Sequence, residues 1–198
     1  AQLTEAVDAA KERIAPLAGE LDEAAGLLEV FPGLLGASGE RVYGVLAQNN
    51  VEIRSTGGLP GQCCRVAARD GLLSLSEVQA IARFMNPRND ETMCVPLTDE
   101  EVALYSRSVG YMSVNVNCIP DFPRVCDIFN QLWSATNGER VDGFVAIDPI
   151  FLQMLMGLTH GTQTADGTVL DGESTVRVLM HDTYWRNLDD YAATDAYF

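Results

Sequence analysis

The second half of the sequence alternates between two hydrophobic periodicities, and this alternation restricts the folds that the chain can adopt. Short apolar runs of the kind found in strands lie at residues 112–116 and 141–147. Segments with helical periodicity lie at residues 121–136, 149–158 and 174–185. Because strands that alternate with helices pair into a sheet that the helices cover, the pattern predicts an α/β fold.

The first half adds strands of a different connectivity. Residues 42–47 and 62–69 are strand-like, and the turn signal at 70–71 leads into a further antiparallel strand at 72–78. We expect 42–47 and 141–147 to be central strands, since their apolar runs suit burial on both sides. The predicted fold is therefore α/β, a mixed central sheet with helices on both faces, plus an N-terminal helical segment.

The predicted helices carry further signals. Asp121 and Asp148 stand where N-caps belong, and Pro149 occupies the favoured first helical position. The apolar residues of the helix at 121–136 share one face and are predicted to enter the core. These are Val125, Ile128, Phe129, Leu132 and Trp133.

The N-terminal segment, residues 1–35, has an amphipathic pattern of its own. Pro16 predicts a kink or split in it. One interpretation is a helical hairpin packed on its own domain, and the other is a stalk or coiled coil that descends from an upstream membrane anchor. Residues 36–198 form the predicted α/β domain, which we expect to stop short of the parent domain's full length. The apolar positions recur at alternating steps of four and three residues: Leu3, Val7, Ala10, Ile14, Leu17, Leu21, Ala24 and Leu28.

Size and charge exclude several classes of protein. The 198 residues, 47% of them apolar, suffice for one good core. A formal net charge of -15 repels nucleic acid and anionic lipid surfaces, and no run of Lys or Arg offsets it, so we expect no nucleic-acid partner. No apolar run approaches the roughly 20 residues of a membrane-spanning helix, so membrane contact is expected only through an upstream anchor.

The cysteines do not form a recognisable metal or redox motif. They number five and lack Cys-x-x-Cys spacing, so buried thiols are the leading interpretation, and no metal site is predicted. A disulfide, for example between Cys118 and Cys126, stays open if the chain works outside the cytoplasm. No hydrolase triad, zincin or P-loop motif occurs.

A polar, Gly-rich loop at residues 48–62 is the leading candidate for a working surface. Asn49, Asn50, Glu52 and Arg54 precede two glycines that permit close approach of the backbone to a ligand. Arg54 suits phosphate or carboxylate, and Glu52 suits sugar hydroxyls or a divalent cation. The alternative is a self-satisfied loop in which Glu52 pairs with Arg54 and the asparagines cap turns.

A second polar cluster follows the strand predicted at 112–116. Asn115 and Asn117 alternate along that strand, while Asp121 and Arg124 open the following helix, where free amides favour anions. If both clusters meet at one sheet edge, they form one cleft. We predict a concave pocket lined by Glu52, Arg54 and Asn117 with Asp121 at its rim. The candidate ligand-binding residues are Asn49, Asn50, Glu52, Arg54, Asn115, Asn117, Asp121 and Arg124.

Three ordered motifs carry a family resemblance. They are VLAQNNVEIRSTGG at 45–58, NCIPDFP at 117–123 and VDGFVAIDP at 141–149. Over roughly residues 36–186 the chain resembles the bacterial family of domains of unknown function numbered four thousand and twelve. That resemblance implies an extracytoplasmic domain of the cell envelope, whose parent is anchored by an N-terminal transmembrane helix.

The layout is more distantly similar to the LytR-CpsA-Psr glycopolymer transferases, which use arginines, aspartates and Mg. In those enzymes a late helix carries several phosphate-binding arginines, and the corresponding stretch here offers Arg177 and Arg186. We expect binding of a cell-wall glycan or polyprenyl-linked sugar, with no catalytic residues or cofactor assigned. The alternatives are a Mg-dependent phosphotransferase that attaches polyprenyl-linked glycopolymers to the wall, and an envelope assembly scaffold.

Overall fold

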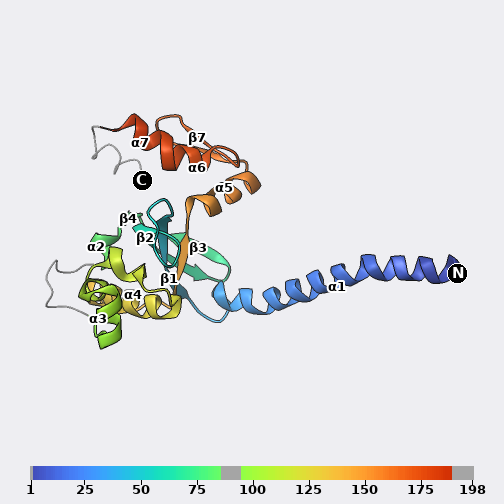
Figure 1. Cartoon of the computed structure of the whole chain (residues 1–198), viewed down its shortest axis with the longest axis horizontal. Coiled ribbons are helices and arrows are strands. Elements are labelled where there is room, and N and C mark those ends of the chain that lie inside the picture. The colour runs from blue at the N-terminus through green and yellow to red at the C-terminus, as the bar shows by residue number, and fades with distance from the viewer. Residues whose placement is uncertain (1, 86–94, 189–198) are drawn as a thin grey trace. The chain divides into compact units, whose positions relative to one another are not determined.

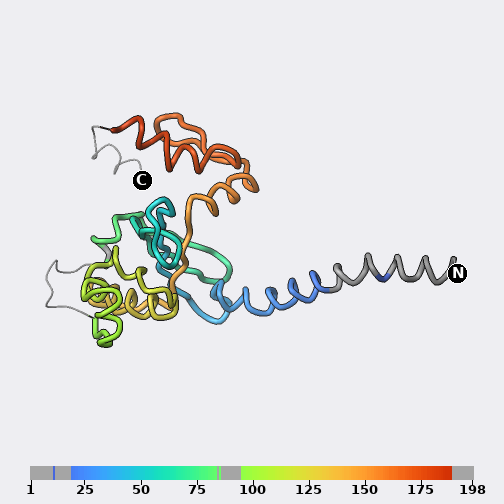
Figure 2. The backbone as a smooth tube through the Cα atoms, in the orientation of Figure 1, coloured from blue at the N-terminus to red at the C-terminus, as the bar shows by residue number. Residues whose placement is uncertain are grey.

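The chain forms two compact units. A computed structural model describes residues 2–85 and 95–188, and the side chains of these residues except 2–10, 12–18 and 84. The first unit comprises residues 1–41 and 67–74, and the second comprises 42–66 and 75–198. Figure 2 traces the backbone of both. Cys94 lies outside the described residues.

The first unit is dominated by one long helix, α1 (Gln2–Leu34). The helix continues through residue 16, so the predicted break and the packed hairpin are both wrong. A proline inside a helix removes one backbone hydrogen bond and does not by itself end the helix. Every residue from 19 to 34 is exposed, so none of the residues that the structure describes covers the apolar side chains of this half of α1.

The end of α1 is fixed to a tight turn within the same unit. The amide of Gly71 donates to the carbonyl of Leu35 at 2.9 Å, and Arg69 pairs with Glu40 at 3.0 Å. Gly36 has a φ of +80°, and a side chain there would collide with the carbonyl of Ala68. Only glycine fits this position, since it tolerates both the left-handed backbone and the close approach.

The sheet is mixed, as predicted (Figure 1). Its hydrogen-bonded order is β3-β2-β1-β5, with β4 paired to β2. Strands β1 and β5 are parallel, with Val45 opposite Val145, and β2 and β4 are antiparallel. A separate two-stranded sheet is formed by β6 and β7. The strands are β1 (Arg41–Asn49), β2 (Leu59–Arg69), β3 (Leu72–Leu75), β4 (Gln79–Ala80), β5 (Gly143–Ile147), β6 (Thr162–Gln163) and β7 (Val169–Leu170).

The helices of the second unit follow most of the predicted segments. The 174–185 segment is helical but interrupted by a π turn, η4. The helices are α2 (Ile81–Met85), α3 (Asp99–Tyr105), η2 (Arg107–Gly110), η3 (Ser113–Cys118), α4 (Phe122–Asn137), α5 (Pro149–Leu158), α6 (Thr175–Arg177), η4 (Val178–Asp182) and α7 (Thr183–Arg186).

The core lies between α4 and one face of the sheet. All five predicted α4 core residues are buried. The ring of Phe144 on β5 lies 5.5 Å from that of Phe129 and 6.3 Å from that of Trp133, centroid to centroid. Gly44 leaves the space that the Phe144 ring fills, because a side chain there would overlap it. The α4 periodicity therefore predicted the centre of the core correctly.

Two predictions about strands are wrong. Residues 112–116 are not a strand, since η3 coils through Ser113–Cys118. Strand β5 lies at the edge of the sheet rather than at its centre, and Val145 is 46% exposed. Burial on both sides, which we inferred from the apolar run, therefore does not hold for β5. The α/β class and the mixed sheet are confirmed.

Candidate functional site

The loop between β1 and β2 is closed by its own hydrogen bonds. The carbonyl of the Asn49 side chain accepts from the amide of Val51 at 3.0 Å, and the Asn49 Nδ2 donates to Glu52 at 3.3 Å. Arg54 donates to the carbonyl of Ile53 at 3.2 Å. The asparagine cap is thus present, but Glu52 bonds to Asn49 and not, as the alternative assumed, to Arg54.

The two polar clusters lie next to each other, as the sequence suggested. The contacts between them are hydrogen bonds that hold the loop in place. Asn117 is fully buried and its Nδ2 donates to the carbonyl of Gly58 at 2.5 Å. The hydroxyl of Ser55 donates to the carbonyl of Cys118 at 2.7 Å. These bonds fasten the loop onto η3. Asn117 therefore has a supporting position beneath the loop.

The remaining predicted residues of the second cluster make local contacts. Asn115 donates to Ser108 at 3.2 Å. Asp121 is the N-cap of α4 by backbone conformation, although its side chain makes no capping bond. Neither residue, nor Arg54, lines the groove described below, so that groove takes Glu52 from the predicted set and leaves out Arg54, Asn117 and Asp121.

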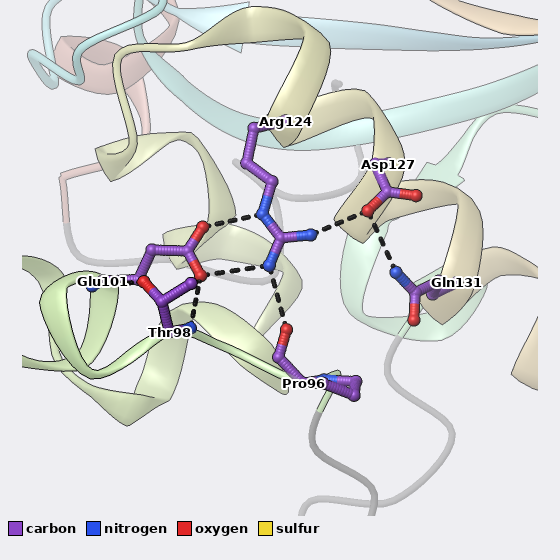
Figure 3. A network of polar contacts seen from close by, with 6 residues as sticks. All are labelled: Pro96, Thr98, Glu101, Arg124, Asp127 and Gln131. Carbon is purple, nitrogen blue, oxygen red and sulfur yellow. Dashed lines mark hydrogen bonds and ion pairs between the residues drawn. The ribbon is translucent and has the colours of Figure 1, made fainter.

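Arg124 is the centre of a network that joins α3 to α4 (Figure 3). Its Nε and Nη2 donate to the two carboxylate oxygens of Glu101 at 2.7 and 3.1 Å. Nη1 donates to Asp127 at 2.7 Å, and Nη2 also donates to the carbonyl of Pro96 at 2.9 Å. All the donor nitrogens of this guanidinium are engaged, so Arg124 holds two helices together.

The same network orders the start of α3. Thr98 and Glu101 form a capping box, in which each side chain accepts from the backbone amide of the other residue. The hydrogen bond from Arg124 lowers the pKa of Glu101, and the reciprocal bond raises the pKa of Arg124. Glu101 is therefore ionised well below neutral pH.

A groove of about 660 Å³ lies within the second unit. Its lining residues come from strands β1, β2, β4, β5 and β7 and from helices α2, α5, η4 and α7, together with the segments between them. Its polar lining residues are Gln48, Asn49, Glu52, Gln62, Arg83, Asp148 and Tyr184. Its apolar lining residues are Ala47, Leu59, Val78, Ala80, Ile147, Pro149, Leu152, Leu170, Leu179 and Met180.

Asp148 connects the polar loop to the wall of the groove. One of its carboxylate oxygens caps α5 by accepting from the amide of Phe151 at 2.8 Å, as predicted for an N-cap. The other accepts from Asn50 Nδ2 at 3.3 Å. Of the eight predicted ligand residues, Asn49 and Glu52 line the groove and Asn50 lies next to it through this bond.

The wall contributed by residues 178–184 was not recognised from the sequence. Leu179 and Met180 belong to the π turn η4, and Tyr184 follows in α7. A π turn inside a helix is uncommon and occurs frequently at functional sites. The residue pattern of a π turn is that of an ordinary helix, so no signal in the sequence marked it.

Arg83 is the second lining residue that sequence reasoning missed. It lies in α2, is exposed, and makes no ion pair or side-chain hydrogen bond among the described residues. A guanidinium that lines an apolar groove and has no partner among these residues is available to an anionic ligand.

The described cysteines are free thiols, so the suggested Cys118–Cys126 disulfide is absent. Cys63 and Cys64 are buried in β2, as expected. Burial raises the pKa of Cys63 to about 12, and it also raises the pKa of Cys64 and Cys126. Thiols of this kind are unreactive, which assigns them to packing.

Across residues 2–85 and 95–188, no three His, Cys, Asp or Glu side chains gather to hold a metal ion. Within the same ranges, no helix combines the length and apolar composition needed to cross a bilayer.

The architecture defines a mixed α/β domain with a largely apolar groove beside its parallel strand pair. Residues 38–184 match the family described as Protein of unknown function (DUF4012), and the chain belongs to that family. The match spans β1 to α7 and so includes the groove. No curated protein and no solved structure matches the chain.

Proposed function

We propose that this domain binds an amphiphilic lipid-linked sugar in the groove. The observation that carries the proposal is the distribution of its lining, with apolar side chains along the walls and polar side chains at Asn49, Glu52, Gln62 and Arg83. Small-molecule sites have this composition, with mostly apolar walls and a few polar groups that orient the ligand.

The volume supports a ligand of moderate size. Small-molecule sites enclose about 300 to 1,000 Å³, and the groove, at about 660 Å³, lies within that range. An isoprenoid chain packed on Leu152, Leu179 and Met180 contributes about 25 cal/mol for each Å² of apolar surface removed from water. A water-soluble glycan alone would leave these walls unused.

The polar residues fit the head of such a ligand. Arg83 is the groove's cation and suits the phosphate that links sugar to lipid. Asn49, Gln62 and Glu52 offer donors and acceptors to sugar hydroxyls. In a chain with a net charge of -15, an anion is attracted only by such a local guanidinium.

We further propose that the partner is a cell-wall glycan precursor and that the domain works outside the cytoplasm, in the cell envelope. The same proposal includes a parent anchored by an N-terminal transmembrane helix. Support comes from the family resemblance of the three motifs and from the ligand chemistry of the groove.

The more distant relation to the LytR-CpsA-Psr transferases also belongs to this proposal. It rests on the parallel β1–β5 pair and on a polar loop that follows β1. A phosphotransferase reaction would need Arg54, Arg124 and carboxylates to converge on one phosphate. Because Arg124 is engaged by Glu101, Asp127 and Pro96, we favour binding over transfer.

The test is binding of a polyprenyl-phosphate sugar in detergent micelles, measured by isothermal titration calorimetry. Arg83→Ala is expected to weaken binding at least tenfold, and Ala80→Phe, which fills the groove, to abolish it. Arg140→Ala removes an exposed arginine outside the groove and should bind like the parent protein.

A second titration with the free polyprenol, which lacks phosphate and sugar, separates the two parts of the ligand. Arg83→Ala should leave binding of the polyprenol unchanged. Equal affinity of all three variants for the phosphate sugar, with unchanged melting temperatures, would refute the proposed site.

A further inference from the structure

The proposed function does not explain the exposed apolar face of α1. Leu21 is 69% exposed, Leu28 is 71% exposed and Phe31 is 46% exposed. These residues continue the spacing of four and three residues that starts at Leu3. The repeat therefore extends from Leu3 to Phe31, through four heptads of an unbroken helix.

The seven-residue length of the repeat distinguishes a flat surface from a second helix as the partner of α1. A straight α-helix drifts about 20° for each heptad of a strict seven-residue repeat, or about 80° over four heptads. A helix that lay on a flat surface would therefore lose its apolar contacts along its length. A second helix that coils around α1 keeps every apolar position at the interface.

The charges of α1 do not oppose a second copy of the same helix. With Leu21 and Leu28 at the heptad's a positions, a parallel pair brings the g position of one helix to the e position five residues later in the other. Those contacts are Ala6 with Lys11, Arg13 with Ala18, Glu20 with Ala25, and Leu27 with Pro32. None of these pairs joins like charges.

In the described half of α1, Glu20 flanks this interface at a g position, and the other acidic residues lie away from it. Asp22, Glu23 and Glu29 occupy outer heptad positions, and all three are exposed. Helices that lie on membrane surfaces carry Lys and Arg on the polar face, because bilayers are commonly anionic. The acidic outer face therefore disfavours a lipid surface as the partner.

The outer positions also include residues that weaken an isolated helix. Gly19, Gly26 and Gly33 recur every seven residues, and Pro16 lies in the first half. Glycine and proline are the least favourable residues in the interior of a helix. A helix with these residues and no apolar cover requires stabilisation from a partner.

We propose that α1 forms a parallel two-stranded coiled coil with α1 of a second copy of this chain. The interface consists of the a and d positions from Leu3 to Phe31, flanked by Leu27 and Leu34 at g positions. Ala10 and Ala24 are small d residues, so the association is of moderate strength. High salt strengthens it by screening the net charge of -15 on each copy.

The test is sedimentation equilibrium of the full chain over a range of protein concentrations, in 0.15 M and in ~0.5 M salt. The Debye length is about 8 Å at the lower salt concentration and falls toward 3 Å, its value at 1 M, as salt is added. Leu28→Glu places a charge at an a position and should raise the dimer dissociation constant at least tenfold. Val30→Glu, also on α1 and 57% exposed, lies at an outer position and should leave the constant unchanged.

A disulfide test fixes the direction of the pair. In a parallel coil, Leu28→Cys lies opposite its own copy and should cross-link under mild oxidation, with the parent protein as the control for its own cysteines. A monomeric parent protein at ~0.1 mM, where a coil with a micromolar dissociation constant would be dimeric, overturns the proposal. Equal dissociation constants for Leu28→Glu and Val30→Glu do so as well, and absence of the cross-link in a dimer overturns the parallel arrangement.

Discussion

Replacing Arg124 with alanine should destabilise the second unit by about 3 kcal/mol. The Arg124 side chain is 26% exposed and that of Glu101 is 15% exposed, so their two-pronged contact is shielded from water on most sides. Charge-assisted hydrogen bonds of this kind contribute about 1.5 to 3 kcal/mol, and the bond to the Pro96 carbonyl adds about 1 kcal/mol. Asp127 is 47% exposed, so its bond adds at most about 0.5 kcal/mol.

Urea denaturation followed by tryptophan fluorescence measures this loss, because Trp133 lies in the core that α4 shares. With a slope of about 2 kcal/mol per M, the midpoint should fall by roughly 1.5 M. Arg140→Ala is the matched control, since it removes an exposed arginine without these contacts. A midpoint for Arg124→Ala within about 0.3 M of the control, less than 1 kcal/mol at that slope, would refute the structural role.

Three further outcomes are expected. The pKa of Glu101 is lowered in the folded protein, so its contribution is complete above about pH 4.3, the unfolded value, and is lost as pH falls through the lower folded value. Glu101→Gln should therefore flatten the acid limb of a stability profile below pH 4.3, and an unchanged limb would contradict this. Trp133→Ala should cost about 3 to 5 kcal/mol in urea denaturation, because Trp133 is only 1% exposed, and an unaltered midpoint would place the residue outside the core. Cys63, with its pKa raised to about 12, should react with iodoacetamide at pH 8 at least a hundredfold more slowly in the native than in the unfolded protein, as read by mass spectrometry. Rapid native labelling would mean that β2 opens.

Elements whose structure follows from their own residue pattern were predictable from the sequence. The apolar face of α4 identified all five of its buried residues, because a helix that packs on one side repeats its apolar positions every three to four residues. Strand β1 and the N-cap at Asp148 were found for similarly local reasons.

The errors arose where distant parts of the chain decide the structure. Alternation of Val and Asn at 113–118 has the period of a strand, but this segment instead coils into η3, where Asn117 bonds to Gly58, 59 positions away. A contact across that separation cannot be read from local spacing. The edge position of β5 depends likewise on which strands pair, and its apolar run alone did not reveal it.

The candidate site was predicted only in part for the same reason. Asn49 and Glu52 attracted attention because polar residues beside glycines are conspicuous in a sequence. The rest of the groove comes from ordinary apolar residues such as Leu152 and Met180, which meet only when the segments around them fold together. Most lining residues of an apolar groove therefore cannot be recognised from the sequence alone.

The pairing of β1 with β5 has a consequence for biosynthesis. Val45 lies opposite Val145, so the partner of β1 is made 100 residues after it. At about 5 to 20 residues per second, the ribosome needs roughly 5 to 20 s to supply that partner. During this interval one edge of β1 offers unpaired amides and carbonyls to any neighbouring nascent chain. Slower translation through residues 50–142 would lengthen the exposure, so the yield of folded protein should depend on codon choice in this stretch and on chaperones that shield a strand edge.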